Sequence, residues 1–167
     1  MKTLLRLAPL FLFMLLIGCA QNPAKPAFAP AGAGFSVQMP GTPQERTNPN
    51  GTHMYAVQVG KLAYIVGYHD LPPRIRPTAS VRERVFDASR DAMTGQGGAK
   101  LLGEQETTLD GHPGREMKLK TREGYFMQLK TAFNGSRLYQ VSVVTPMDES
   151  TAPEINRFID SFHFTNP

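Results

Sequence analysis

The sequence predicts an α+β domain in which an antiparallel sheet of about six to eight strands is flanked by two main helices. Short segments that alternate apolar and polar residues recur along most of the chain, and such alternation is typical of strands with one buried face. Two further segments carry apolar residues at helical spacing. The connections between successive strand segments are short enough for hairpins, which makes neighbouring strands antiparallel.

The first predicted strands lie before residue 69. Phe35–Met39 alternates apolar and polar residues until Pro40-Gly41 breaks it, so it is expected to form a strand. His53–Val59 and Leu62–Tyr68 flank the pair Gly60-Lys61, and glycine at the first central position favours a type II′ hairpin turn. Because both of these strands are apolar at most positions, we expect the hairpin to be central and covered on both faces.

A proline-rich loop over residues 71–77 leads to the first predicted helix. Ser80 and Glu83 have the spacing of a capping box, which places Ser80 at the N-cap. The helix is expected to run to about Thr94 and to be terminated by Gly95–Gly98. Its predicted buried stripe has three- to four-residue spacing and consists of Val81, Val85, Ala88, Ala92 and Met93.

The second half of the domain is predicted to be a meander closed by a helix. We expect strands over residues 100–109, 115–120, 125–133 and 136–145. Asp110–Gly114 is a tight connection, and Asn134-Gly135 predicts a type I′ turn in which Phe133 faces Ser136. Thr151–Glu154 forms a second capping box. The closing amphipathic helix and the short strand that follows it carry Ile155, Phe158, Ile159, Phe162 and Phe164.

The N-terminal region has the organisation of an export signal. Lys2 and Arg6 precede an apolar run that ends at Ile17 and is shorter than the roughly 20 residues of a membrane span. The run closes with Leu16-Ile17-Gly18-Cys19, which resembles the lipobox of bacterial lipoproteins. This resemblance implies cleavage between Gly18 and Cys19 and acylation of Cys19. A single uncleaved membrane anchor is the alternative interpretation of the same run.

Three regions follow from this interpretation. They are a signal peptide over residues 1–18, a lipidated Cys19 with a Pro/Ala/Gly tether over residues 19–34, and a single folded domain over residues 35–167. In the Gram-negative lipoproteins that the motif resembles, an Asp after the cysteine retains the protein in the inner membrane. Ala20 occupies that position here, which implies a protein of the bacterial cell envelope attached to the outer membrane and facing the periplasm.

Cysteine content and charge exclude several function classes. Cys19 is the only cysteine, so the chain has no disulfide partner, and a thioether-linked Cys19 serves neither thiol catalysis nor a cysteine zinc site. Cleavage would remove Lys2 and Arg6 but no acid, which lowers the formal net charge from +4 to +2. This small excess gives little reason to expect nucleic acid as a partner.

No catalytic, metal or cofactor site is predicted. In the expected hairpin register His53 and His69 point to opposite faces, which argues against a shared metal ion, although a one-residue bulge would reverse this. The chain lacks the Gly-x-Ser-x-Gly motif of serine hydrolases. Dispersed acids could still converge in space as a hydrolytic pair; they are Asp70, Glu104, Glu106, Asp110 and Glu116.

Five arginines within 17 residues form the one candidate binding patch: Arg74, Arg76, Arg82, Arg84 and Arg90. Guanidinium groups bind carboxylates and phosphates through paired hydrogen bonds, so the patch could take an anionic lipid headgroup or an acidic partner. Acids of the same stretch could instead neutralise the arginines locally. These acids are Glu83, Asp87 and Asp91.

Four segments together resemble the Mog1/PsbP-like domains found in many bacterial lipoproteins. They are Phe35–Pro43, Leu109–Glu116, Arg137–Val141 and Phe158–Phe164, and the resemblance spans about residues 34–165. It implies an antiparallel sheet sandwiched between helices, an αβα sandwich. The group contains binding and assembly factors rather than one shared enzyme activity, and it transfers no catalytic or ligand residue to this chain.

The expected function is therefore that of a membrane-tethered, non-enzymatic envelope lipoprotein that binds another protein or assists assembly. The alternative is a carrier of an apolar or amphiphilic small ligand, because apolar residues on both faces of the sheet could line a cavity. A third candidate is a hydrolase built on the dispersed acids. No cofactor is expected.

Overall fold

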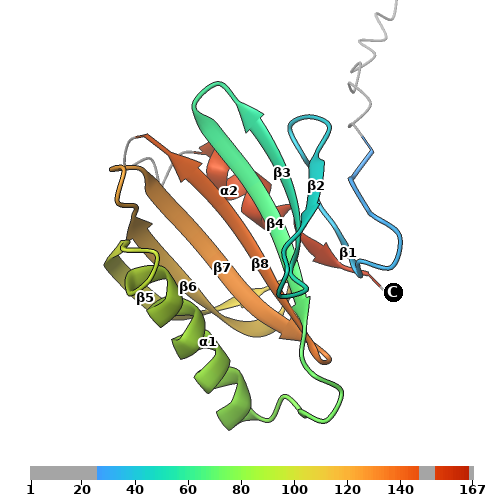
Figure 1. Cartoon of the computed structure of the whole chain (residues 1–167). Coiled ribbons are helices and arrows are strands. Elements are labelled where there is room, and N and C mark those ends of the chain that lie inside the picture. The colour runs from blue at the N-terminus through green and yellow to red at the C-terminus, as the bar shows by residue number, and fades with distance from the viewer. Residues whose placement is uncertain (1–25, 147–152, 166–167) are drawn as a thin grey trace, which may run out of the picture.

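A seven-stranded antiparallel sheet carries one helix on each face, with a two-stranded sheet at its side (Figure 1). The structure is a computed structural model that describes residues 26–146 and 153–165. This architecture confirms the predicted α+β fold with two helices. The elements are β1 (Phe35–Ser36), β2 (Gln44–Thr47), β3 (His53–Val59), β4 (Leu62–Asp70), α1 (Ala79–Thr94), β5 (Lys100–Leu109), β6 (His112–Lys120), β7 (Phe126–Asn134), β8 (Arg137–Thr145), α2 (Pro153–Asp160) and β9 (His163–Phe164).

The predicted signal peptide and the expected attachment residue Cys19 lie outside the described residues, and so does the start of the second capping box at Thr151. Within residues 26–146 and 153–165, no helix is long and apolar enough to cross a membrane.

The large sheet has the strand order β2-β3-β4-β8-β7-β6-β5. Strands β2, β3 and β4 form one side of the sheet. The chain then crosses through α1 to β5 at the opposite edge, and β6, β7 and β8 follow inward until β8 pairs with β4. Val66 lies opposite Val141 across this central pair. The two halves of the domain therefore meet in the middle of the sheet, and α1 is the connection between them.

Two hairpin turns use glycine in the same way. Val59 pairs with Leu62 and Gly60 has a φ of +60°, as the type II′ prediction requires. The type I′ prediction for the β7–β8 hairpin is wrong, because Asn134 pairs with Arg137 and the loop consists of Gly135 and Ser136. Gly135, with a φ of +59°, again takes the first central position, which makes a type II′ turn.

Other strand boundaries also differ from the expectation. β2 falls between the predicted strands Phe35–Met39 and His53–Val59, where no strand was expected, because its four residues are all polar and show no apolar alternation. β6 begins at His112 rather than at Arg115, because Asp110 and Gly111 alone make the preceding turn. Both turn residues have positive φ values, +46° and +77°. The predicted short final strand is present as β9 and pairs with β1.

The main core lies between the large sheet and α2. The apolar stripe of α2 is buried as predicted, with Ile155, Phe158 and Ile159 at most 4% exposed. These side chains pack on residues that alternate along β4 and β8, such as Val66 and Val143. Burial of this apolar surface drives the association of the two layers.

Residues 28–37, which include β1, pack onto this same core and are called the N-terminal strap below. Phe28 forms a β-bridge with Val37, and its ring lies 5.2 Å from that of Tyr55. Ala33 is fully buried. The tether predicted to run to residue 34 therefore ends earlier: residues 28–34 belong to the packed domain, because Phe28 pairs with Val37 and both Ala33 and Gly34 are buried.

The N-cap of the first helix lies two residues before the predicted one. Thr78 is the N-cap, and its hydroxyl accepts a hydrogen bond from the backbone N–H of Val81. The predicted capping box is therefore wrong: Ser80 lies inside the helix, and Glu83 binds Arg115 instead of the helix start. The predicted C-terminal end of the helix is confirmed, because α1 ends at Thr94 and is followed by Gly95.

The packing of α1 differs more from the expectation. Phe86 is the one fully buried residue of the helix, and it packs on Phe133 and Leu138 of the sheet. Of the predicted buried stripe, Ala88 and Ala92 are exposed and the other members are half-buried. The helix lies over the β5–β7 side of the sheet in Figure 1. No described helix covers the same face of β3 and β4, so this hairpin is not covered on both faces as expected.

Candidate functional site

An open apolar groove of about 710 Å³ lies between α1 and the central strands; it is called the α1 groove below. One wall is the helix stripe that was expected to be buried, including Val81, Val85 and Ala88. Phe86 packs on Phe133 of β7 and Leu138 of β8, and Val85 touches the same cluster, whereas Ala88 and Ala92 on this flank of α1 stay exposed beside the groove. The volume of the groove falls in the range of about 300–1,000 Å³ that is typical of ligand sites.

The floor and ends of the groove come from parts of the chain that are distant in sequence. Leu138 and Gln140 of β8 and His69 of β4 form the floor, and Ile75 in the β4–α1 loop closes one end. The Nδ1 atom of His69 is buried and has no hydrogen-bond partner among the described residues. An unpaired buried polar atom is costly, and a hydrogen bond to this nitrogen would relieve that cost.

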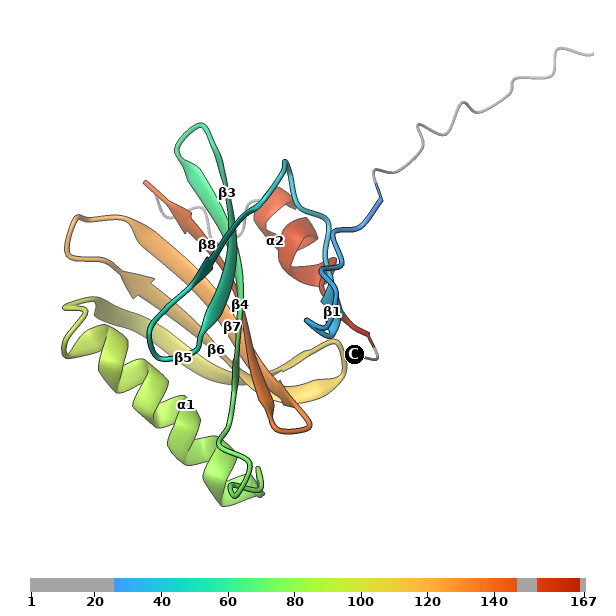
Figure 2. The same ribbon diagram turned by 45° about the vertical axis from the view of Figure 1, so that its right-hand side comes forward.

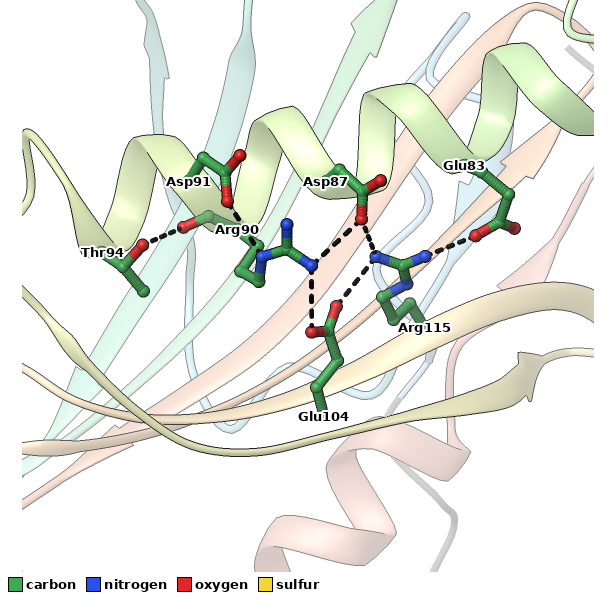
Figure 3. Close-up of polar contacts among 7 residues, drawn as sticks. All are labelled: Glu83, Asp87, Arg90, Asp91, Thr94, Glu104 and Arg115. Atoms are coloured by element: carbon green, nitrogen blue, oxygen red, sulfur yellow. Dashed lines mark hydrogen bonds and ion pairs between the residues drawn. The ribbon is translucent and has the colours of Figure 1, made fainter.

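Three acids of α1, none of which lines the groove, form ion pairs with two arginines (Figure 3). Arg115 of β6 binds the carboxylates of Glu83, Asp87 and Glu104, with distances of 2.6 Å to Asp87 and 2.9 Å to Glu104. Arg90 binds Asp87, Asp91 and Glu104 at 2.9–3.3 Å. Glu104 belongs to β5, so the network fastens α1 to two strands at once.

Electrostatics within this network favour the charged forms. The hydrogen bond from Arg115 holds the pKa of Asp87 below its usual value. Burial works against the charge of Arg115, but its hydrogen bonds to Asp87 and Glu104 outweigh this and raise the pKa of the guanidinium group. The side chain of Arg115 is 13% exposed and lies 5.4 Å above the ring of Phe86. The ion pairs of this network thus hold α1 on the sheet rather than forming a reactive site.

The five arginines of the predicted patch do not form one surface. Arg90 is engaged in the network just described, and Arg82 donates to the backbone oxygen of Pro77 at 2.9 Å. Arg84 lines the α1 groove, and Arg74 and Arg76 flank Ile75 at its end, all three being exposed. Local neutralisation therefore applies to Arg90. Arg84 in the groove lining, with the exposed Arg74 and Arg76 on either side of Ile75 in the chain, is called the basic rim below.

The histidines lie at separate places. His53 pairs with Tyr68 in the register expected for the hairpin and stacks on its ring at 4.7 Å. His69 points to the groove, and His163 donates to Asp110 at 2.9 Å. Within the described ranges, no three His, Cys, Asp or Glu side chains lie close enough together to hold a metal ion.

The dispersed acids are held by different partners. Asp70 binds Arg137, Glu104 binds Arg90 and Arg115, and Asp110 accepts from His163 and the N–H of Phe164. Glu116, 8% exposed, accepts hydrogen bonds from the amides of Gln105 and Gln128. Glu106 is exposed on β5. Glu104 and Glu116 line one pocket with Gln105 and Lys118, but their carboxylates are bound by different partners, and the other three acids lie elsewhere.

Arg137 links the N-terminal strap to the end of the groove. Its side chain pairs with Asp70 and also donates to the backbone oxygens of Gly32 and Ala33 at 2.7 and 3.0 Å. The guanidinium carbon lies 4.3 Å from the ring centre of Tyr68, which lines the groove. Sequence reasoning missed Arg115 and Arg137 as organising residues. Both lie in segments that carry the family resemblance, Leu109–Glu116 and Arg137–Val141, but nothing local indicated which residues they would bind.

Comparison with known proteins supports the fold but no activity. No family model and no curated protein matches the chain. Among solved structures, cyanobacterial PsbP (CyanoP) from Synechocystis is similar with a TM-score of 0.58 and 14% identity, over 83% of this chain and 91% of CyanoP. A Pseudomonas aeruginosa protein of unknown function, PA94, has a TM-score of 0.49 and 11% identity, over 76% and 99% of the two chains.

The similarity to CyanoP covers most of both chains, whereas the identity is too low to carry over residues or roles. The expectation that came from the four sequence segments is confirmed at the level of fold. The described domain, with its antiparallel sheet between α1 and α2, has the PsbP-like fold.

Proposed function

We propose that the chain is a lipid-anchored binding protein of the bacterial cell envelope that acts without catalysis and holds another protein in its α1 groove. The observation that carries the proposal is the groove itself: an apolar helix flank, an uncovered sheet face and a basic rim. Exposed apolar surface of this kind is costly in water unless a partner covers it, and on soluble domains it marks binding sites.

The N-terminal motif supports the envelope location. Gly18 and Cys19 stand at the end of a signal-like apolar run, and Ala20 follows in the position that favours the outer membrane by resemblance. Because the N-terminal strap belongs to the domain, residues 20–27 alone remain as tether. Eight residues reach about 25 Å in an extended polyproline conformation at ~3.1 Å each. The domain would therefore stay close to the periplasmic face of the membrane.

The placement of the strap supports a protein partner rather than the anchoring bilayer. The strap packs on the α2 side of the sheet, and α1 with its groove lies on the other side (Figure 2). A chain that leaves from the strap toward the membrane presents the groove on the opposite face. The groove is also open along its length, which suits a protein segment that remains part of a larger surface.

The second candidate is a carrier of an apolar or amphiphilic small ligand. The volume of the groove, about 710 Å³, favours it. Carriers commonly enclose 70–90% or more of the ligand surface, however, and the core between the sheet and α2 is filled by side chains such as Phe35 and Phe162. The hydrolase candidate is not favoured, because the two acids that share a pocket, Glu104 and Glu116, are bound by arginines and by amides.

Intact mass of the membrane-extracted protein tests the anchor. We expect a chain that starts at Cys19 and carries acyl groups, and a Cys19→Ser variant that lacks this modification. An unmodified mass in the wild type would contradict the lipoprotein part of the proposal, and it would leave the uncleaved membrane anchor or a free periplasmic protein.

Site-specific photo-cross-linking in intact cells tests the binding part. A photoreactive amino acid at Ala92 would lie in the groove, and one at Lys61 would lie in the exposed β3–β4 turn as a matched control. We expect a discrete adduct with an envelope protein from position 92 and none from position 61. The absence of any adduct at position 92 would contradict a protein partner in the groove.

A further inference from the structure

The flank of α1 that lines the groove has the residue spacing of a helix–helix seam. Val81, Val85, Ala88 and Ala92 are separated by four, three and four residues, which is the spacing through which one helix packs along another. Val81 and Val85 are half-buried, and Ala88 and Ala92 are exposed. Val85 also packs against the cluster of Phe86, Phe133 and Leu138, but no second helix among the described residues lies along the seam.

The small side chains of the seam favour a helix as its occupant. Interaxial distances between packed helices are about 8–10 Å and depend on the size of the side chains at the contact. Ala88 and Ala92, with Ser89 beside them in the groove lining, let another backbone approach closely. The lining from Val81 to Met93 extends about 18 Å at ~1.5 Å per residue, or roughly three helical turns.

The sheet offers the second surface that such a helix needs. Leu138 and Gln140 form the floor beside α1. Farther along the same face, Ile65 of β4 and Ala56 of β3 pair with each other and are half-buried. α1 covers the β5–β7 side of this face and leaves the β3–β4 side open (Figure 1). A second helix beside α1 would cover the open part.

Charge determines which helix fits. None of the three acids of α1 lines the groove, and Arg115 and Arg90 bind them; they are Glu83, Asp87 and Asp91 (Figure 3). The residues that line the groove include Arg84 and no Asp or Glu, and Arg74 and Arg76 flank its end. An entering helix with acidic flanks would meet these cations.

We infer that the α1 groove receives an acidic amphipathic helix of about three turns or more, contributed by another envelope protein. The inference rests on the proposed function of the groove as a protein-binding site and adds the class of partner. The apolar stripe of the partner packs against Val85, Ala88 and Ala92, and its carboxylates lie along the rim formed by Arg74, Arg76 and Arg84. An acidic amphipathic helix thus complements both the apolar seam and the basic rim of the groove.

A synthetic peptide provides a direct test with the full-length, lipidated protein in phosphatidylcholine nanodiscs. The probe is a fluorescein-labelled 21-residue helix with Leu at the a and d positions and Glu at the e and g positions. Its companion has Lys in place of every Glu, and empty nanodiscs measure binding to the lipid. We expect the Glu peptide to bind at least tenfold more tightly than the Lys peptide, as measured by fluorescence anisotropy.

Three variants locate the binding. Ala88→Glu places a bulky acid in the seam, and Arg84→Glu reverses a rim charge, so each is expected to weaken binding of the Glu peptide at least tenfold. Lys61→Glu makes a matched charge change in the β3–β4 turn and is expected to change binding less than twofold. The inference would be overturned if the Glu and Lys peptides bound equally well. It would also be overturned if Ala88→Glu and Arg84→Glu left the affinity for the Glu peptide unchanged. Displacement of the peptide by sodium palmitate at equal concentration would overturn it too, in favour of a fatty-acid site.

Failure of this inference can be separated from failure of the proposed function. An adduct from position 92 whose cross-linked partner segment, identified by mass spectrometry, is neither acidic nor helical would overturn the acidic-helix inference and leave a protein-binding groove. No adduct from position 92 and no peptide binding would remove both. Thermal unfolding of each variant, expected to match the wild type because the changed positions are exposed, confirms that losses of binding do not reflect loss of fold.

Discussion

Arg137 and Asp70 form a two-point ion pair at the end of the central strands. Nε of Arg137 lies 2.7 Å from Oδ1 of Asp70, and Nη2 lies 2.9 Å from Oδ2. The hydrogen bonds from Arg137 lower the pKa of Asp70. The same guanidinium group holds the carbonyl oxygens of Gly32 and Ala33, so one side chain joins β4, β8 and the N-terminal strap.

Replacing Arg137 by methionine should release the strap. The change keeps much of the aliphatic stem but removes the donors to Asp70, Gly32 and Ala33, and we expect a loss of about 2–3 kcal/mol from charged hydrogen bonds of partly exposed groups. Urea unfolding of the full-length protein in detergent measures the loss. Hydrogen exchange should also rise in residues 28–34; unchanged exchange there would contradict the role of Arg137.

A side chain at Gly34 is expected to lower the free energy of unfolding. The φ of Gly34 is +72°, and a Cβ would lie 2.5 Å from the hydroxyl of Tyr139, which donates to the oxygen of Ala33. Gly32, with a φ of +71° and open space around its Cβ position, is the matched control. We expect Gly32→Ala to cost about 1–2 kcal/mol for the backbone alone and Gly34→Ala about 1–3 kcal/mol more for the clash.

A double variant checks the cause of that difference. Tyr139→Phe removes the hydroxyl that the new Cβ would meet. In its background, the excess cost of Gly34→Ala over Gly32→Ala should shrink, as urea unfolding would show. If the excess stays the same, the clash with Tyr139 is not its origin.

Arg115 should stabilise the docking of α1, whereas Arg84 should not. Arg115→Met keeps apolar contact with Phe86 but leaves the carboxylates of Asp87 and Glu104 with Arg90 alone. We expect a loss of about 2 kcal/mol and faster amide exchange throughout α1. Arg84→Met, at an exposed position, should change stability by no more than about 0.5 kcal/mol. Equal effects of the two substitutions would argue against the network as a fastening.

The β5–β6 turn should make stability depend on pH in the acidic range. A hydrogen bond from His163 and another from the N–H of Phe164 lower the pKa of Asp110, against the opposing effect of burial. The folded-state pKa lies below the unfolded value of about 3.9, so Asp110 stabilises the fold above pH ~4. This contribution is lost as the pH falls through the lowered pKa.

Asp110→Asn isolates this contribution, because asparagine tolerates the positive φ of +46° at this position. The difference in unfolding free energy between wild type and variant should be largest near pH 5–6 and should narrow from pH 4 downward. A difference that stays constant to pH 2 would show that the charge of Asp110 contributes nothing.

Local signals predicted the elements of the fold well, and non-local contacts decided what they missed. Gly60-Lys61 specified its hairpin register, but residues 134–136 contain two overlapping turn signals, Asn-Gly and Gly-Ser. Both are compatible with a hairpin, and the cross-strand packing of β7 on β8 selects Gly135-Ser136. Periodicity likewise identified the apolar flank of α1. It carried no information on how far the helix reaches across the sheet.

The N-terminal strap was missed for a similar reason. Its Pro/Ala/Gly composition is typical of a linker, and nothing local marks Ala33 as buried. Its burial depends on Arg137 and Tyr139, more than a hundred residues away along the chain. The basic rim of the groove was predicted in part: Arg84 lines it and Arg74 and Arg76 flank its end, whereas Arg90 faces Glu104.

The pairing of β1 with β9 brings the beginning and the end of the folded domain side by side, with Phe35 opposite Phe164. A short linker could therefore join the two ends, and new termini could be opened at the exposed Gly60-Lys61 turn without cutting a buried strand. Such a circularly permuted chain would move the point of attachment from the strap to the β3–β4 turn. It would thus separate the orientation imposed by the anchor from the binding properties of the domain.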